Sequence, residues 1–223
     1  MLEAIEISSM PSSDASDQLF ARIAEDISNK GYSINPSVLP VELGSALLHH
    51  VLDMNEDKFD PAGIGRDQQL MLNEFVRSDE ICWITGESDA GKAWLQWTNQ
   101  MQVYLNRTLF LGLFSFESHF AHYARGDYYK RHLDAFKGEA NRVLTLVVYL
   151  NPEWGIEDGG ELVLFSDEHD QSGIKVTPLM GTVVVFLSED FPHEVLAANR
   201  DRYSIAGWFR VNTSTAERVD PPA

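Results

Sequence analysis

Residues 142–150 read Arg-Val-Leu-Thr-Leu-Val-Val-Tyr-Leu, and residues 182–187 read Thr-Val-Val-Val-Phe-Leu. Both runs are short and rich in β-branched and aromatic residues, and they lie between clusters of turn-forming residues, which is typical of buried β-strands. Both are far shorter than the ~20 apolar residues that a membrane-crossing helix requires. We therefore expect them to form the centre of a β-structure.

Segments of the same kind continue from residue 111 towards the C-terminus. We expect strands near residues 113–123, 128–135, 142–150, 161–165, 174–178, 182–187, 193–197 and 203–212. Short strands at this spacing predict a sandwich or an open barrel of the jelly-roll type.

The first half of the chain has helical periodicity instead. Apolar residues recur every three to four positions from about residue 14, again after Pro40, and over residues 91–106. No linker or repeat separates the two halves. We therefore expect one domain over residues 1–223, with supporting helices, the first strands and a substrate loop in residues 1–110 and a jelly-roll core in residues 111–213.

Composition excludes several classes of protein. The formal net charge is −17 at pH 7, which leaves few cations to neutralise nucleic acid or an anionic membrane. The single cysteine, Cys82, rules out an internal disulfide and a cysteine-rich zinc cluster. The N-terminus has no basic segment typical of an export signal. We expect a cytoplasmic monomer without nucleic-acid or membrane partners.

His132 and Asp134 are the first residues that indicate chemistry. Residues two apart on a strand point to the same face, so an imidazole and a carboxylate would lie side by side. Taken alone, such a pair is more typical of a solvated surface. His193 adds a second imidazole, and two histidines with one carboxylate form the facial triad of non-haem ferrous oxygenases, which leaves coordination positions open.

Arg202 lies nine positions after His193. We expect the two residues on paired antiparallel strands of one hairpin, so that both face the barrel interior. A guanidinium can bind a carboxylate through two parallel hydrogen bonds. Arg202 is therefore a candidate anchor for a dicarboxylate whose other end chelates the metal.

The pattern around these residues resembles that of the Fe(II)- and 2-oxoglutarate-dependent dioxygenases. Within that superfamily it is similar to the prolyl hydroxylases of the oxygen-sensing type and their bacterial relatives. The similarity covers about residues 75–212 and rests on the following motifs: Arg77-Ser78-Asp79 with Trp83-Ile84, Tyr123, His132/Asp134, Arg142, Tyr149-Leu150-Asn151, Gly159-Gly160-Glu161-Leu162, His193-Glu194-Val195 and Arg202-Tyr203. The fold that it implies is mainly β, a double-stranded β-helix (jelly roll, cupin-like) packed against N-terminal helices.

The resemblance implies a role for each matching residue. His132, Asp134 and His193 would bind Fe(II), and Arg202 would bind the distal carboxylate of 2-oxoglutarate, with Tyr149 and Tyr123 beside it. Residues assigned in the same way to substrate binding are Arg142, Asp79, Trp83 and Trp208. Read without the family, Tyr149 and Trp208 are core residues of strands and Arg142 is a surface arginine. Where the animal enzymes have a threonine beside the cosubstrate, this chain has Ala206.

Residues 86–93, Gly-Glu-Ser-Asp-Ala-Gly-Lys-Ala, nearly form a phosphate-binding loop. Ala93 lacks the hydroxyl that would bind Mg²⁺, and Glu87 and Asp89 would repel a triphosphate. We therefore interpret this segment as the mobile loop that closes over the substrate. The remaining histidines are interpreted as core or surface residues: His49, His50, His119, His122 and His169.

The resemblance implies a prolyl 4-hydroxylase that acts on a protein and uses Fe(II), 2-oxoglutarate and O₂, with ascorbate as a further candidate cofactor. Bacterial relatives include hydroxylases of elongation factor Tu, which makes a proline of that factor the favoured target. Two alternatives stay open. One is an oxygenase that acts on another side chain or on a small molecule, and the other is a non-enzymatic jelly-roll sensor of iron or a dicarboxylate.

Overall fold

The computed structural model describes residues 13–62, 76–135 and 141–212. Three long helices precede most of the strands: α1 (Ser13–Lys30), α2 (Val41–Asp53) and α3 (Asp89–Leu109). The strands of the first half are β1 (Tyr32–Asn35), β2 (Asp60–Pro61) and β3 (Glu80–Trp83). Those of the second half are β4 (Leu113–Tyr123), β5 (Tyr129–His132), β6 (Arg142–Tyr149), β7 (Leu162–Leu164), β8 (Ile174–Val176), β9 (Val183–Leu187), β10 (His193–Val195) and β11 (Arg202–Val211). The short 3₁₀ helices are Glu56–Lys58 and Ile156–Asp158.

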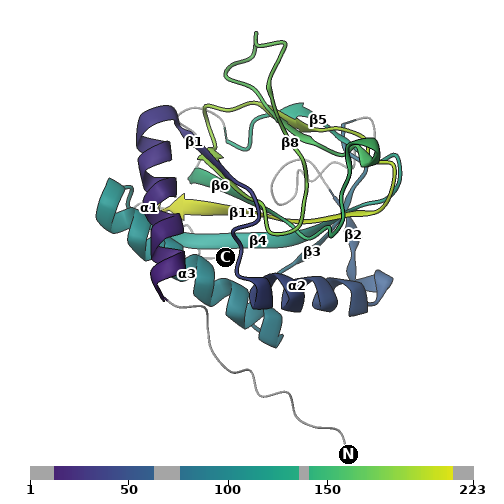
Figure 1. Ribbon diagram of the computed structural model, residues 1–223, viewed down its shortest axis with the longest axis horizontal. Coiled ribbons are helices and arrows are strands. Elements are labelled where there is room, and N and C mark those ends of the chain that lie inside the picture. The colour runs from purple at the N-terminus through teal and green to yellow at the C-terminus, as the bar shows by residue number, and fades with distance from the viewer. Residues whose placement is uncertain (1–12, 63–75, 136–140, 213–223) are drawn as a thin grey trace, which may run out of the picture.

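The strands form two antiparallel sheets. The large sheet has the order β1-β9-β6-β11-β4-β3-β2, and the small sheet has the order β5-β10-β7-β8. This arrangement confirms the predicted jelly roll with N-terminal helices, and each predicted strand has its counterpart within a few residues. Figure 1 shows the small sheet above the large one, with α2 and α3 below.

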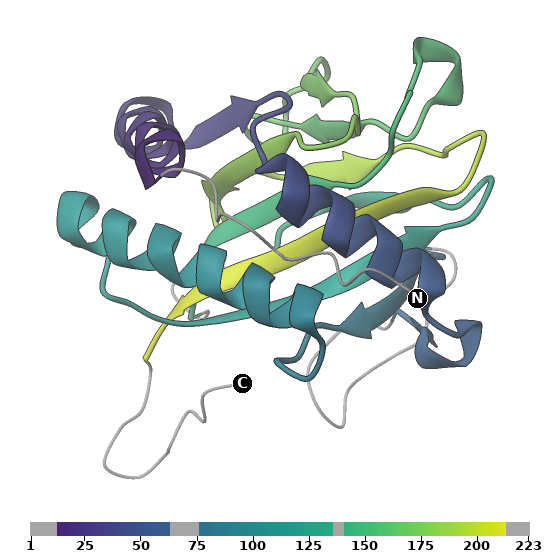
Figure 2. The ribbon, with the colours of Figure 1, turned by 60° about the horizontal axis from the view of Figure 1, so that its bottom comes forward.

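The helices cover one face of the large sheet, as Figure 2 shows for α2 and α3 in front of β11 and β4. Their apolar stripes meet the inward residues of the central strands in one buried cluster, which includes Trp94, Met101, Leu146, Ile205 and Phe209. A second cluster lies between the two sheets and contains aromatic and β-branched residues of both. Each central strand therefore supplies alternate residues to two different interiors.

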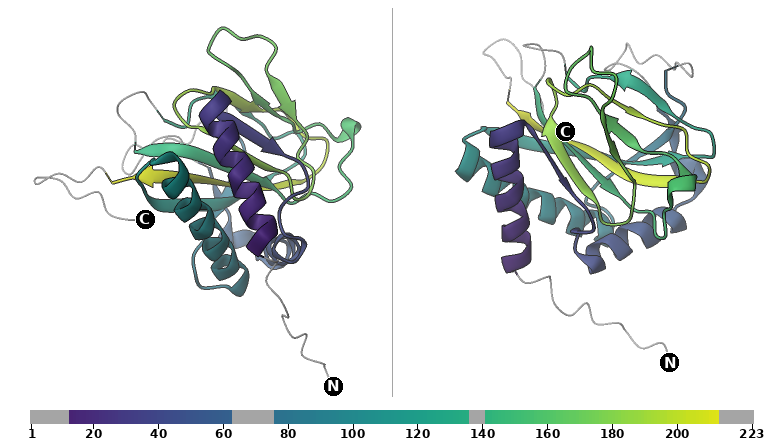
Figure 3. Two further views of the ribbon diagram at one scale, coloured as in Figure 1. Left: turned by 60° about the vertical axis from the view of Figure 1, so that its left-hand side comes forward. Right: turned by 45° about the horizontal axis from the view of Figure 1, so that its top comes forward.

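β1 is a strand of the N-terminal part that the helical periodicity did not predict. β1 pairs with β9 and extends the large sheet at its edge, beside α1, and Figure 3 shows it following α1 directly. Its inward positions are the polar Ser33 and Asn35. The hydroxyl of Ser33 donates to Asp26 at 2.7 Å and accepts from the side-chain amide of Asn35 at 2.8 Å. No helix among the described residues combines the length and the hydropathy that a bilayer crossing demands.

Candidate metal centre and its surroundings

His132, Asp134 and His193 converge between the two sheets. His193 at the start of β10 is the register partner of His132 at the end of β5. The Nε2 atom of each histidine lies 3.6 Å from an oxygen of Asp134, and the three donor atoms all lie within 4.8 Å of one another. We predicted that Asp134 lies on the same strand as His132, but β5 ends at His132 and Asp134 lies beyond it. The chain bends there and still brings the carboxylate to the imidazoles.

Backbone carbonyls fix the orientation of both imidazoles. Nδ1 of His132 lies 2.8 Å from the carbonyl oxygen of Lys130, and Nδ1 of His193 lies 3.1 Å from that of Phe191. A carbonyl oxygen only accepts hydrogen bonds, so a neutral imidazole in either position has its proton on Nδ1. The lone pair of each Nε2 is thereby directed at the space beside Asp134, which is the arrangement that metal-binding histidines require.

The site has the protonation state of a metal centre. Burial and the neighbouring His132 lower the pKa of His193 to about 4, against the attraction of Asp134. Burial alone would raise the pKa of Asp134, but the imidazoles and a hydrogen bond from Thr145 hold it well below its usual range. At neutral pH the carboxylate is charged and His193 is neutral. This donor set fits a divalent ion such as Fe(II) and leaves open coordination positions on one side.

Arg202 lies near this centre at the start of β11 and is almost completely buried, with 1% of its surface exposed. Its Nε donates to the carbonyl of Gly160 at 2.9 Å, and its Nη1 donates to the hydroxyl of Ser204 at 3.2 Å. Within the described part of the chain, no carboxylate forms an ion pair with it. A buried charge without a counter-ion is expensive, so this guanidinium fits an anionic ligand.

Tyr123 and Tyr149 border the same guanidinium, whose carbon lies 4.8 and 5.1 Å from their ring centroids. Tyr123 is the register partner of Arg202 on β4, and Tyr149 ends β6. Burial raises the pKa of Tyr149 to about 12, so its hydroxyl stays protonated. That hydroxyl is buried beside the guanidinium, and its proton has no acceptor among the described residues. A donor without an acceptor, beside a guanidinium without a counter-ion in the described part of the chain, fits the distal carboxylate of 2-oxoglutarate.

The connection between His193 and Arg202 differs from our prediction. β10 pairs with β5 and β7 in the small sheet, whereas β11 pairs with β4 and β6 in the large one. The two strands therefore form no hairpin, because residues 196–201 carry the chain from one sheet to the other. His193 and Arg202 contribute to the same interior from opposite sides, which the sequence separation alone did not reveal.

Asp79 does not face an open surface. Its exposed fraction is 1%, and Arg77 binds both its oxygens at 2.7 and 2.6 Å. The guanidinium of Arg77 in turn lies over the ring of Tyr129 at 4.3 Å, and that ring stacks on His132 with centroids 3.6 Å apart. Asp79 is thus connected to His132 through Arg77 and Tyr129. Sequence analysis missed Tyr129, although it lies three residues before His132.

Arg142, Trp208 and Trp83 lie on strands of the large sheet, where Trp208 is buried and is the register partner of Thr145. Arg142 stacks on the ring of Trp208 at 3.7 Å, and Trp83 leaves about half of its surface exposed. Arg142 also donates to Glu117 at 2.8 Å, and Arg210 pairs with the second oxygen of that carboxylate at 3.2 Å. Sequence analysis missed Glu117 and Arg210, which only the register of β4, β11 and β6 brings together.

The segment that we interpreted as a mobile substrate loop begins helix α3. Ser88 caps this helix, its hydroxyl accepting from the amide of Gly91 at 3.0 Å. Gly91 is required because an added Cβ would lie 2.3 Å from the carbonyl oxygen of Thr85. The glycine therefore allows close packing, and residues 89–93 form the first turn of α3 rather than part of a loop.

Comparisons with known proteins agree with this geometry. A profile described as the 2OG-Fe(II) oxygenase superfamily matches residues 118–210. The structure of a prolyl-4-hydroxylase from Pseudomonas putida is similar with a TM-score of 0.76 and 37% sequence identity, over 86% of this chain and 98% of that one. A prolyl hydroxylase from Trichoplax adhaerens, in complex with a peptide fragment of the hypoxia inducible factor oxygen degradation domain, has a TM-score of 0.78 and 25% identity, over 88% and 91% of the two chains. A prolyl 4-hydroxylase of Phytophthora capsici, 22% identical over 93% of this chain and 68% of that one, shares the fold with a TM-score of 0.73.

Proposed function

Because the chain belongs to the 2OG-Fe(II) oxygenase superfamily and is an Fe(II)- and 2-oxoglutarate-dependent dioxygenase, we propose that it hydroxylates a prolyl residue in a protein. The observation that carries this proposal is the similarity to the Pseudomonas putida prolyl-4-hydroxylase over nearly the whole of that chain. The Trichoplax adhaerens enzyme, which binds a peptide, supports a polypeptide as the substrate.

Each chemical requirement has residues that fit it. His132, Asp134 and His193 hold the metal, while Arg202 and Tyr149 hold the distal carboxylate of 2-oxoglutarate. Tyr123 closes the guanidinium off from water by covering its face. When bound, Fe(II) with 2-oxoglutarate and O₂ supplies the oxidising power needed to hydroxylate an unactivated carbon. The residues of the chain orient the partners and keep the interior dry.

The surface beside the metal centre is suited to a peptide. Arg142 is held over Trp208 by Glu117, so its guanidinium is preorganised to donate to a carbonyl of the substrate backbone. The exposed ring of Trp83 adds an apolar contact, since a proline and its neighbours offer mainly apolar surface. We assign these residues to substrate recognition.

A prolyl site of elongation factor Tu is the first target to test, because bacterial relatives of this group include hydroxylases of that factor. Purified protein, Fe(II), 2-oxoglutarate and elongation factor Tu are incubated in air, and peptides are sequenced by mass spectrometry. We expect a prolyl peptide heavier by one oxygen atom, together with succinate, and neither product with Asp134→Ala.

Other outcomes point to other functions. Succinate formation that depends on cell lysate, with an added oxygen on another residue or on a small molecule, would replace the prolyl assignment by the broader oxygenase function. Absence of succinate under every condition, with Fe(II) and 2-oxoglutarate still bound, would favour a sensor without catalysis.

A further inference from the structure

Two hydroxyl groups lie in a row behind the carboxylate of Asp134. Thr145 Oγ1 is 2.8 Å from Asp134 Oδ2, and the same Oγ1 is 2.9 Å from Ser188 Oγ. Thr145 is 1% exposed and Ser188 is completely buried. This row of hydroxyls has no part in the chemistry assigned above.

The direction of both hydrogen bonds follows from the charge on Asp134. An ionised carboxylate only accepts, so Thr145 must donate its single proton to Oδ2. Thr145 can then only accept from Ser188, which makes Ser188 the donor of the second bond. The two bonds run in one sense, from Ser188 through Thr145 to the carboxylate, and in a buried setting each strengthens the other.

The row also joins the two sheets. Asp134 follows β5 of the small sheet, whereas Thr145 lies within β6 and Ser188 directly follows β9, both in the large sheet. The amide of Ser188 donates to the carbonyl of Val143 at 3.0 Å, so its place beside Thr145 is fixed by the ladder of the large sheet. Asp134 has no strand of its own to hold it, and the hydroxyls supply the missing constraint.

We propose that Thr145 and Ser188 are positioning residues that fix the carboxylate of Asp134 for binding the metal through one oxygen. The hydrogen bond to Oδ2 prevents rotation of the carboxylate and uses part of its acceptor capacity. A carboxylate held in this way leaves the coordination positions of the ion free for other oxygen ligands. The inference rests on the proposed role of Asp134 as a metal ligand.

Metal binding without cosubstrate tests this proposal directly. Mn(II), a stable stand-in for Fe(II), is titrated into the metal-free full-length protein in the absence of 2-oxoglutarate and followed by electron paramagnetic resonance. Loss of a hydrogen bond to a ligating residue typically weakens metal affinity by about 10- to 100-fold. We expect a loss of that size for Thr145→Val, a smaller loss for Ser188→Ala, and affinity close to wild type for Thr145→Ser, which keeps the hydroxyl.

Thr98→Val is the matched control. Thr98 is also 1% exposed, but its hydroxyl donates to backbone carbonyls of helix α3, on the other face of the large sheet. This variant should bind Mn(II) as tightly as the wild type, even if its thermal stability is lower. Equal losses of Mn(II) affinity in Thr98→Val and Thr145→Val would show a general effect of stability and overturn the proposal.

Two further outcomes are decisive. A folded Thr145→Val protein that binds Mn(II) as tightly as the wild type overturns the proposal, and if that variant does not fold, wild-type affinity in Ser188→Ala does so. Wild-type affinity in Asp134→Ala would instead refute the metal site itself, so failure of the site and failure of the positioning role give different results.

Discussion

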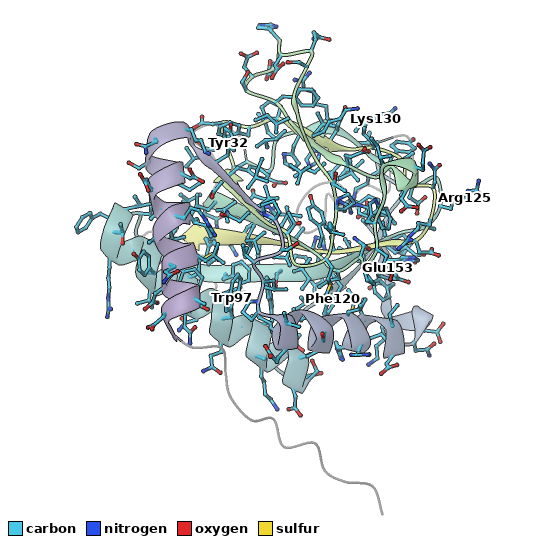
Figure 4. All side chains as sticks on the ribbon, in the orientation of Figure 1. Tyr32, Trp97, Phe120, Arg125, Lys130 and Glu153 are labelled. Atoms are coloured by element: carbon cyan, nitrogen blue, oxygen red, sulfur yellow. The ribbon has the colours of Figure 1, made fainter. Side chains whose placement is uncertain are left out.

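The two faces of the large sheet carry different kinds of buried side chain. On the helix-facing side the strands present Leu144, Leu146, Val148, Ile205 and Phe209 to the helices. On the side that faces the small sheet, the same strands bury Thr145, Tyr149, Arg202 and Ser204. In Figure 4, Trp97 and Phe120 lie between the helices and the sheet, whereas Lys130 lies on β5 above it.

Residues that stabilise the fold and residues that line the ligand site therefore alternate along the same strand. Burial of apolar surface stabilises the fold by ~25 cal/mol per Å², and the helix-facing side supplies it with few polar groups. The side between the sheets buries charged groups such as Arg202, which has no ion-pair partner in the described part of the chain. Burial of such a group adds little to stability but prepares it to bind a ligand of opposite charge. Substitutions on the two faces should therefore give opposite patterns of effect.

The largest effect is expected for Asp134→Ala. Removal of the carboxylate of the metal centre should lower 2-oxoglutarate turnover, measured as succinate, by about 1,000-fold or more, since a barrier increase of ~4 kcal/mol corresponds to that factor. Turnover within tenfold of the wild type would contradict the assignment of Asp134.

Leu146→Ala, next along β6 to Thr145, should give the converse result. Leu146 is completely buried against the helices, and such a truncation typically costs about 2–5 kcal/mol. Urea unfolding should show a loss of about 3 kcal/mol, while kcat/KM of the folded fraction stays near wild type. A loss below about 1 kcal/mol would mean that the helix-facing side is not the main source of stability.

The next largest effect expected is a loss of stability at low pH, caused by the buried imidazoles of His119 and His193. Burial, aided by the charge of Arg77, lowers the pKa of His119 to about 4, and that of His193 is lowered to a similar value. The unfolded chain takes up protons near pH 6.5 and the folded chain does not, so stability is present above that pH and is lost as pH falls towards 4. Each of the two imidazoles should lower the free energy of unfolding by about 2 kcal/mol as the pH falls from 7 to 5.

Urea unfolding of the metal-free protein at both pH values measures this loss. His119→Phe should remove about half of it, because one of the two titrating imidazoles is gone. An unchanged pH dependence in this variant would contradict the assigned role of His119.

The smallest effect is expected for Tyr149→Phe, and it has opposite signs for stability and binding. The hydroxyl of Tyr149 is buried and its proton has no acceptor among the described residues, so its removal should raise the free energy of unfolding by up to about 1 kcal/mol. The affinity for 2-oxoglutarate should fall about tenfold, since a hydrogen bond to a charged group is lost. Thermal shift with and without 2-oxoglutarate separates the two, and a destabilised variant with unchanged affinity would refute this role.

Sequence could predict the β-rich half because its signals are local. Residues 142–150 and 182–187 became β6 and β9 almost without change. β1 was missed because its inward positions are Ser33 and Asn35, which invert the usual alternation. A short strand with buried polar residues is recognisable only from its partner, here Asp26 of α1.

The site, too, has residues that local sequence signals reveal and residues that only strand pairing reveals. The spacing of His132 and Asp134 and the family motif were enough to bring out the three metal-binding candidates and Arg202. Thr145 was within reach, because it lies four residues before Tyr149 on the same strand face. Ser188 and Glu117 were not, since their contacts depend on which strands pair and at which register, and no local pattern encodes that pairing.

Binding of a small dicarboxylate by Arg202 would make the lifetime of the protein depend on its metabolic surroundings. A small dicarboxylate present at about 100 times its dissociation constant stabilises a folded protein by about 2.7 kcal/mol. Molecules that open less often are degraded less often. When such acids are scarce, the chain would therefore lose abundance as well as turnover, so that starvation acts on the amount of enzyme before any change in its synthesis.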